Sequence, residues 1–170
     1  QLPLFPFPRL RHVIVLGDRP HADVLSYDDL LAGASSMLEA EPTSRDDHAL
    51  WLYSSGSTGA PKGCVHLHHD MVICAELFGK GILQIQEQDR CFSVAKLFFA
   101  YGLGNNMYFP MRVAGQGVLH PDRPTPDGMF ELIHRHRPSL FFGVPTLYAA
   151  MLQIKDAERR WDLSSLRLCV

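Results

Sequence analysis

The residues whose types and spacing could do chemistry are concentrated in residues 53–63, with the sequence YSSGSTGAPKG. Its glycines Gly56, Gly59 and Gly63 permit backbone conformations closed to other residues and let the chain approach a ligand closely. Successive main-chain N–H groups in such a turn can form a concave anion site. Neighbouring hydroxyl groups and the mobile cation of Lys62 suit phosphate oxygens. The segment is therefore predicted to clamp phosphate, the alternative being a flexible surface turn.

The spacing in this segment differs from that of the mononucleotide P-loop, G-x-x-x-x-G-K-[ST]. Counted from Gly56, Pro61 stands where the second glycine belongs and Gly63 stands where the Ser/Thr belongs. A linker is also disfavoured, because the turn ends in Pro-Lys-Gly between two apolar runs.

Strand and helix patterns alternate around this turn, and they must position it. Apolar runs predict strands at residues 12–16, 50–53, 64–67, 91–94, 117–119, 140–142 and 166–170. Helical patterns occupy residues 71–83, 103–109, 125–135 and 146–155, with Asp70 as a cap of the first. Ser26 and Asp29 predict an earlier helix start, with Leu30, Leu31 and Leu38 behind it. Uniformly apolar strands that alternate with helices predict an α/β fold with a largely parallel sheet flanked by helices on both faces.

The organisation of the chain suggests a piece of something larger. Its 170 residues, 46% of them hydrophobic, suffice for about one domain. The polar segment 39–48 is predicted to be a connecting loop. The last apolar run, residues 166–170, ends the chain without a covering helix, and the opening QLPLFPFPRL is equally abrupt. We therefore expect an α/β fragment truncated at both ends.

Composition argues against several classes of partner. Sixteen basic and 18 acidic residues leave a net charge of -2, which disfavours a generic nucleic-acid binder or a binder of anionic membranes. No apolar run approaches the roughly 20 residues of a membrane span, and no targeting peptide is visible. The four cysteines form no CxxC pair and have apolar neighbours, which predicts small buried thiols in a reduced, cytoplasmic setting. These cysteines are Cys64, Cys74, Cys91 and Cys169.

The histidine-rich stretch HLHHD could suggest a metal site. It contains His66, His68, His69 and Asp70, which are residue types that bind zinc. In a β run, however, His66 and His68 would point to one side and His69 to another. We therefore expect no metal site there.

The segment YSSGSTGAPKG resembles the signature loop of the adenylate-forming superfamily of acyl- and aryl-CoA synthetases. The stretches HLHHDM, FSVAKLFFAYGLGN and PSLFFGVPTLYAAML are similar to benzoate-CoA ligases and their hydroxybenzoate relatives. The resemblance covers nearly the whole chain. It implies that residues 1–170 are part of the large N-terminal, AMP-binding domain, with the C-terminal domain absent.

Members of this family use Mg²⁺ and ATP to convert a carboxylate to an acyl-adenylate, and then transfer the acyl group to coenzyme A. The resemblance implies that the signature loop holds the β- and γ-phosphates, with Lys62 and Thr58 in catalytic roles. The ATP-phosphate positions carried over from the family are Ser54, Ser55, Gly56, Ser57, Thr58, Gly59 and Lys62.

The resemblance also implies an acid-binding pocket around the turn KLFFAYGLGN. Its candidates are Phe99, Ala100, Tyr101, Gly102 and, after the strand 140–142, Gly143. An aromatic side chain there could stack on an aryl ring, and small residues leave room for it. The alternative is that these aromatics are ordinary core residues and that Gly143 lies at a strand-to-helix corner without a ligand.

The resulting hypothesis is an acid–thiol ligase for benzoate or hydroxybenzoate, acting in aromatic compound degradation in the cytoplasm. One alternative is an aryl-acid adenylation domain that loads a carrier protein, and another is a non-catalytic nucleotide-binding domain. The family's adenine, ribose and Mg²⁺ ligands and its adenylation lysine would follow residue 170. The chain alone is therefore expected to be inactive.

Overall fold

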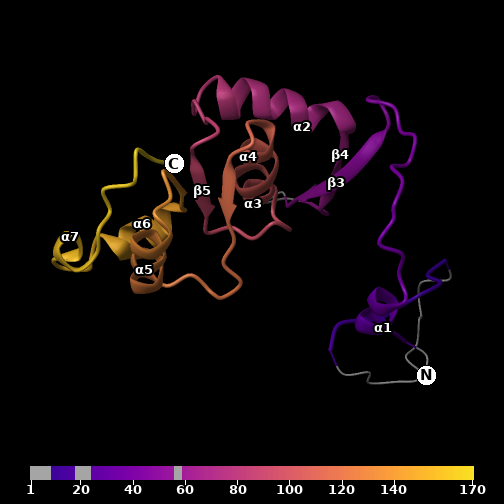
Figure 1. Ribbon diagram of the computed structural model, residues 1–170, viewed down its shortest axis with the longest axis horizontal. Helices are drawn as coiled ribbons and strands as arrows, with labels where there is room; N and C mark the ends of the chain where they lie inside the picture. The colour runs from indigo at the N-terminus through magenta and orange to yellow at the C-terminus, as the bar shows by residue number, and fades with distance from the viewer. Residues whose placement is uncertain (1–8, 18–23, 56–58) are drawn as a thin grey trace. The chain divides into compact units, whose positions relative to one another are not determined.

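The computed structural model describes residues 9–17, 24–55 and 59–170 (Figure 1). The chain divides into two compact units, Gln1–Pro42 and Thr43–Val170. The boundary between them falls within the polar segment 39–48. Helices and strands of both units follow the alternation that the sequence predicts.

The first unit contains a small parallel strand pair and one short helix. Strand β1 (Ile14–Val15) pairs with β2 (Leu25–Ser26), and helix α1 (Tyr27–Ala32) follows. The Asp29 N–H donates to the Ser26 hydroxyl oxygen at 3.2 Å, which confirms the predicted helix start. The prediction of a buried strand over residues 12–16 is wrong: the strand has two residues and Leu16 is exposed. The described part of this unit has too few elements to cover a strand on both faces.

The second unit begins with a hairpin that brackets the glycine-rich segment. Strands β3 (His48–Ser54) and β4 (Lys62–Leu67) are antiparallel, with Ser54 opposite Lys62. The two predicted strands are confirmed. Their antiparallel pairing departs from the parallel sheet because residues 55–61 are too few for the crossover that parallel strands need.

Two helical runs follow the hairpin. Helix α2 (His68–Cys74) continues as a π-helical turn, η1 (Ala75–Lys80). The Asp70 carboxylate accepts from the Leu67 N–H at 3.0 Å and so caps α2, which starts earlier than predicted. His68 and His69 consequently lie in the first turn of a helix and not in a strand. The second run comprises α3 (Ala100–Leu103), η2 (Gly104–Tyr108) and α4 (Phe109–Arg112).

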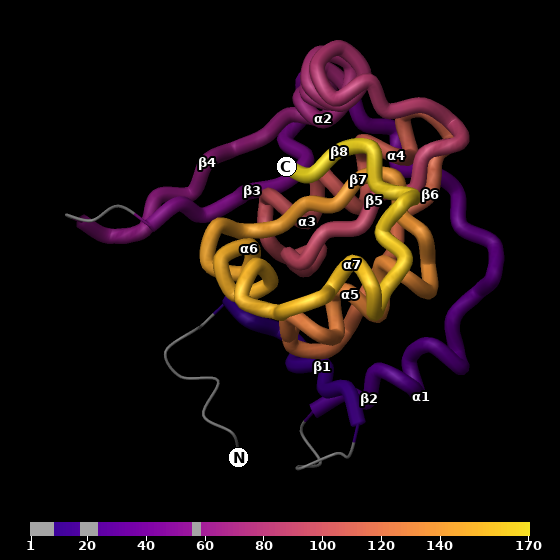
Figure 2. Tube along the Cα trace, turned by 90° about the vertical axis from the view of Figure 1, so that its left-hand side faces the viewer, coloured from indigo at the N-terminus to yellow at the C-terminus, as the bar shows by residue number. Residues whose placement is uncertain are grey.

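A four-stranded parallel sheet forms the centre of the second unit (Figure 2). Its strands are β5 (Arg90–Ser93), β6 (Gln116–Val118), β7 (Leu140–Phe142) and β8 (Leu168–Cys169), in the order β6-β5-β7-β8. Helix α5 (Pro126–His136) connects β6 to β7, and helices α6 (Pro145–Met151) and α7 (Ala157–Arg160) connect β7 to β8. The predicted parallel sheet is confirmed.

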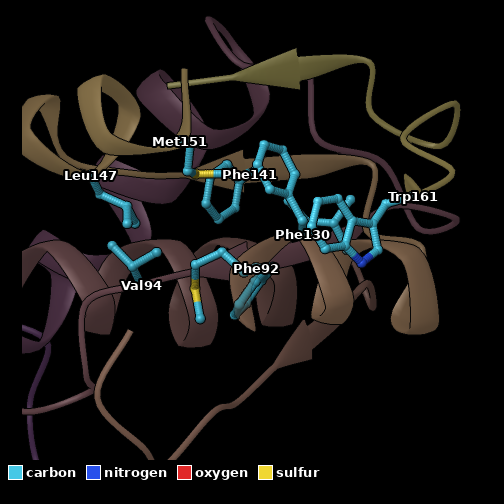
Figure 3. Close-up of a cluster of buried hydrophobic side chains, with 9 residues drawn as sticks. Phe92, Val94, Phe130, Phe141, Leu147, Met151 and Trp161 are labelled. Atoms are coloured by element: carbon cyan, nitrogen blue, oxygen red, sulfur yellow. The ribbon is translucent and has the colours of Figure 1, made fainter. Parts of the chain in front are cut away.

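Apolar side chains cover both faces of this sheet. On one face, Phe92 and Phe141 pack with residues of α5 and α6, and Phe130 stacks on Trp161 with ring centroids 5.0 Å apart (Figure 3). On the other face, Cys91 and Phe142 pack with Ala75 of η1 and Phe109 of α4. Burial on both faces explains why the strands are apolar throughout.

The cysteines correct one prediction. Cys91 is buried in the sheet, and that burial raises the pKa of its thiol to about 12. Cys64, Cys74 and Cys169 are exposed, although all four are free thiols as predicted. Cys64 lies on β4 close to Ser54, at the open end of the hairpin.

A polar network ties the strands together at their amino ends. The Asp89 carboxylate, just before β5, accepts from Arg167 Nε at 2.9 Å and from Arg167 Nη2 at 2.6 Å. It also accepts from the Ser139 hydroxyl at 2.6 Å and the Gln86 N–H at 2.9 Å. Because Ser139 precedes β7 and Arg167 precedes β8, the network joins the amino ends of three strands. The carboxyl ends of these strands lie on the opposite side of the sheet.

In the residues that the structure describes, none of the helices has the length and apolar character to cross a membrane.

Candidate functional site

The open end of the β3–β4 hairpin carries the described part of the predicted phosphate loop. Ser54 and Lys62 are cross-strand neighbours there, and both side chains are exposed. The Ser54 hydroxyl oxygen lies 3.9 Å from the sulfur of Cys64. Ser55 and Gly59 are also exposed, and a Cβ on Gly59 would meet no atom within 4 Å. The hairpin therefore exposes the hydroxyl group of Ser54 and the cation of Lys62 at the end where the predicted phosphate loop begins.

Three predicted phosphate positions, Gly56, Ser57 and Thr58, lie outside the described residues. Their roles, and those of Ser54, Ser55, Gly59 and Lys62, stay predictions. The hairpin nevertheless gives the loop a firm base, because the ladder is continuous from Leu50 opposite His66 to Ser54 opposite Lys62.

An apolar cavity of about 800 Å³ lies at the carboxyl ends of the parallel strands. Residues that directly follow β5, β7 and β8 line it, together with residues of α3, α6 and the loop before α5. In open α/β sheets, ligands bind at the carboxyl ends of the strands, at the point where the connections from two adjacent strands leave in opposite directions. Here β5 connects to β6 on one side and β7 connects to β8 on the other. The lining residues are Val94, Ala95, Phe99, Tyr101, Pro124, Gly143, Val144, Pro145, Tyr148 and Val170.

The structure brings three of the five predicted pocket residues together in this cavity: Phe99, Tyr101 and Gly143. The side chain of Phe99 is 56% exposed and that of Tyr101 is 39% exposed, so neither is an ordinary core residue. The Tyr101 ring stands edge-on to Phe142, with centroids 6.3 Å apart. A ring entering the cavity would therefore meet aromatic faces and edges.

Among the described residues that line the cavity none has a charged side chain, and their polar side-chain atoms are two tyrosine hydroxyls. The Tyr101 hydroxyl donates to the Val170 carbonyl oxygen at 3.2 Å. The Tyr148 hydroxyl accepts from the Gly143 N–H at 3.1 Å and lies 3.0 Å from the same carbonyl oxygen. Burial raises the pKa of both phenols, that of Tyr148 to about 12. Both hydroxyls thus stay neutral at physiological pH and are already engaged with the main chain.

Gly143 is required where it stands. A Cβ there would lie 2.5 Å from the Tyr148 ring, closer than real side chains approach. The Tyr148 ring is also fixed on its other side, since it packs edge-on against Phe141 with centroids 5.7 Å apart. The glycine therefore lets the tyrosine lie across the end of β7 and form one wall of the cavity.

Ala100 and Gly102 are not among the lining residues, although both belong to α3. A Cβ on Gly102 would lie 2.2 Å from the carbonyl oxygen of Lys96 and 2.3 Å from that of Ala95. Gly102 thus allows α3 to pack directly on residues 95 and 96. Contact of Ala100 or Gly102 with an acid stays a prediction.

The pattern of residue types pointed to only part of the lining. Tyr148 was missed as a site residue. A usable signal was its place in the first turn of α6, three residues after Pro145, because that turn lies next to the carboxyl end of β7. Pro124 was also missed, because a loop proline carries no signal of which cavity it borders. Val144 and Pro145 follow Gly143 directly and line the cavity as its neighbours.

The histidine-rich stretch contacts neighbouring carboxylates through His69. His69 Nδ1 lies 3.1 Å from a carboxylate oxygen of Asp46, and its Nε2 lies 3.2 Å from one of Asp70. Among the residues described, no group of three or more His, Cys, Asp or Glu side chains could hold a metal ion. These contacts join the turn before β3 to the start of α2.

Comparison with known proteins gives a consistent result. A family described as "AMP-binding enzyme" matches residues 7–170. The chain is 50% identical to the benzoate–CoA ligase of Thauera aromatica over 99% of its own length and 32% of that protein's. It is 47% identical to the 4-hydroxybenzoate–CoA/benzoate–CoA ligase of Rhodopseudomonas palustris, over 96% of this chain and 30% of the relative. The chain thus spans about a third of the length of these relatives.

The fold is likewise similar to that of a solved ligase. The anthranilate CoA ligase AuaEII, in complex with anthranoyl-AMP, superposes with a TM-score of 0.87 at 42% identity. The match covers 95% of this chain and 31% of that structure. The α/β arrangement of the second unit, with the hairpin and the parallel sheet, is therefore that of an adenylate-forming enzyme.

Proposed function

Because the chain belongs to the AMP-binding enzyme family, we propose that it is part of a longer ligase that joins an aromatic carboxylic acid to coenzyme A at the expense of ATP. The observation that carries this proposal is the uncharged cavity at the strand ends, lined by Phe99, Tyr101 and Tyr148. A cavity of this size and character suits a flat apolar ring. The similarity to benzoate–CoA and hydroxybenzoate–CoA ligases supports the same substrate class.

The proposed reaction has two steps. The acid's carboxylate oxygen attacks the α-phosphorus of ATP, which forms an acyl-adenylate and releases pyrophosphate. The thiol of coenzyme A then attacks the acyl carbonyl carbon, which forms the thioester and releases AMP. The hairpin loop is proposed to hold the β- and γ-phosphates. There Lys62 and the hydroxyls of Ser54 and Ser55 would neutralise and position the departing pyrophosphate.

The cavity favours benzoate over acids with polar ring substituents. Both tyrosine hydroxyls already donate to main-chain carbonyl oxygens, so the described side chains of the lining offer a ring hydroxyl or amino group only the phenol oxygens as acceptors and no free donor. An unsatisfied buried polar group costs about 1–3 kcal/mol. We therefore propose benzoate as the preferred acid and hydroxybenzoates as weaker substrates.

The residues described provide no magnesium site. Mg²⁺ takes oxygen ligands, usually one or two carboxylates together with phosphate oxygens and water. No lining residue of the cavity has a carboxylate, and no suitable cluster of metal-binding side chains occurs elsewhere in the described ranges. We assign no step to Mg²⁺ within this chain.

The use of ATP and coenzyme A supports a cytoplasmic location for the ligase.

The experiment that tests this proposal follows each step separately in the complete ligase. Benzoate-dependent exchange of pyrophosphate into ATP reports the first step, and formation of benzoyl-CoA reports the second. We expect both activities, and no turnover from the 170-residue chain alone. Exchange without thioester would favour an adenylating domain that loads a carrier protein. Absence of both, in a folded protein that binds ATP, would favour a non-catalytic nucleotide-binding domain.

A further inference from the structure

A lysine outside the cavity connects two of its walls. Lys96 lies in the turn between β5 and α3, next to the lining residue Ala95. Its ammonium group donates to the carbonyl oxygen of His120 at 2.5 Å and to that of Asp122 at 2.6 Å. Both acceptors belong to the loop between β6 and α5, which carries the lining residue Pro124.

The loop that Lys96 contacts has little other support. Residues 119–124 form neither strand nor helix. In the described part of the chain, and apart from the β5–β6 ladder that ends at Val118, the hydrogen bonds that the structure shows to the main chain of this loop both come from Lys96. Hydrogen bonds from a charged donor are shorter and stronger than those between neutral groups. The loop also borders the turn across a small cavity lined by Leu119, His120 and Pro121, and Lys96 supplies the hydrogen bonds that hold it there.

The turn that carries Lys96 is, by contrast, firmly placed. The Phe99 N–H donates to the Lys96 carbonyl oxygen at 3.0 Å, which closes the turn. Helix α3 packs directly on residues 95 and 96 at Gly102, where no side chain would fit. Ser93, at the end of β5, lies just before the turn. The Asn106 side chain accepts from the Ser93 N–H at 2.9 Å and donates to the Val118 carbonyl oxygen at 3.1 Å. A fixed turn and a weakly supported loop are thus joined by the lysine.

We propose that Lys96 is a positioning residue for substrate selection: by holding the loop of Pro124 against the turn of Phe99, it sets the width of the cavity. This inference rests on the proposed function, since it assigns the cavity to the ring of the acid. Lys96 does not line the cavity and is not a catalytic residue. Its loss should let the Pro124 wall move outward, which weakens binding of a small ring and relaxes the exclusion of larger ones.

The test compares Lys96→Met with wild type in the complete ligase. Methionine keeps the apolar stem and removes the donors. We expect the KM for benzoate to rise about tenfold and the KM for ATP to stay unchanged. The specificity constant for para-methylbenzoate, relative to that for benzoate, should increase. Lys96→Arg, which keeps a cation with several donors, should restore part of the selectivity, and Lys155→Met, a change at an exposed lysine that does not line the cavity, should have no effect.

Amide hydrogen exchange gives a readout that is independent of turnover. Lys96→Met should accelerate exchange in peptides covering residues 119–125, with no change in β5 or β7. If Lys96→Met does not fold, Pro124→Ala alters the same wall from the loop side and should shift the ratio of the two acids in the same direction.

The outcomes separate the two proposals. An active wild type with unchanged acid selectivity and unchanged exchange in Lys96→Met overturns the role of Lys96 and leaves the ligase assignment intact. A wild type that activates no aromatic acid overturns the ligase assignment and, with it, the role of Lys96 in selection. A rise in the KM for ATP equal to that for benzoate indicates general loss of structure and also contradicts the proposal.

Discussion

Replacing Asp89 by asparagine is expected to destabilise the parallel sheet at the amino ends of its strands, on the side opposite the cavity. Burial alone would raise the pKa of this carboxyl, but hydrogen bonds from Arg167, Ser139 and Gln86 outweigh it and lower the pKa from 3.8 to about 2. This difference corresponds to about 2 kcal/mol of stability at neutral pH. Asp89 is only 4% exposed, whereas the Arg167 side chain is 40% exposed, so water screens part of this energy and about 2 kcal/mol is an upper value. An asparagine side chain would keep the shape and lose the charge that Arg167 requires.

The sign of the pH dependence follows from the direction of the shift. A carboxyl whose pKa is lowered by folding stabilises the fold fully above its unfolded pKa, and the contribution disappears as the pH falls through the folded pKa. The difference between wild type and Asp89→Asn should therefore be constant from about pH 7 to about pH 5 and shrink between about pH 4 and about pH 2. Urea unfolding of the two proteins at several pH values measures it.

An exposed ion pair of the same chemistry provides the control. Asp127 pairs with Arg160 at 3.0 Å, and both side chains are more than half exposed. Exposed pairs contribute less than about 1 kcal/mol, so Asp127→Asn should have a small effect. Equal losses for the two variants, or a loss at Asp89 that persists unchanged at about pH 2, would refute the reasoning.

Two further predictions concern the site. Lys62→Ala in the complete ligase should reduce pyrophosphate exchange by a factor of about 100 or more, because removing a donor to developing charge costs about 3 kcal/mol. Thr58→Ala should lose less exchange activity. Unchanged exchange in Lys62→Ala would exclude the phosphate clamp. Gly143→Ala should displace the Tyr148 ring, since the new Cβ would lie 2.5 Å from it, at a cost of about 1–3 kcal/mol. The KM for benzoate should then rise. Adding Tyr148→Leu to the Gly143→Ala variant should relieve part of this rise, because the smaller side chain removes the clash. An unchanged KM in Gly143→Ala would mean that Tyr148 does not form the wall.

The sequence was sufficient for the features that depend on local chemistry. Apolar runs such as LFF at residues 140–142 can only be satisfied by burial on both faces, so they predict strands of a covered sheet. The two apolar runs on either side of the glycine-rich segment pair as β3 and β4, as a turn between them requires, whereas the anion-binding role of that segment stays a prediction. Ser26 with Asp29 marks a helix start through a bond made within a few residues. Such features can be predicted because they require no knowledge of distant contacts.

Other features depended on which segments meet. The exposure of Cys64 and the position of His69 between the carboxylates of Asp46 and Asp70 depend on contacts between elements. Separate segments of the chain supply the cavity, and Tyr148 and Pro124 enter it only because parallel strands end at a common edge. Gly102 illustrates the limit most clearly. Its small size suggested room for a ligand, whereas the tertiary structure uses that size for the contact between α3 and the backbone at residues 95 and 96. A glycine's missing side chain is visible in the sequence, but the group that occupies the space is decided by the fold.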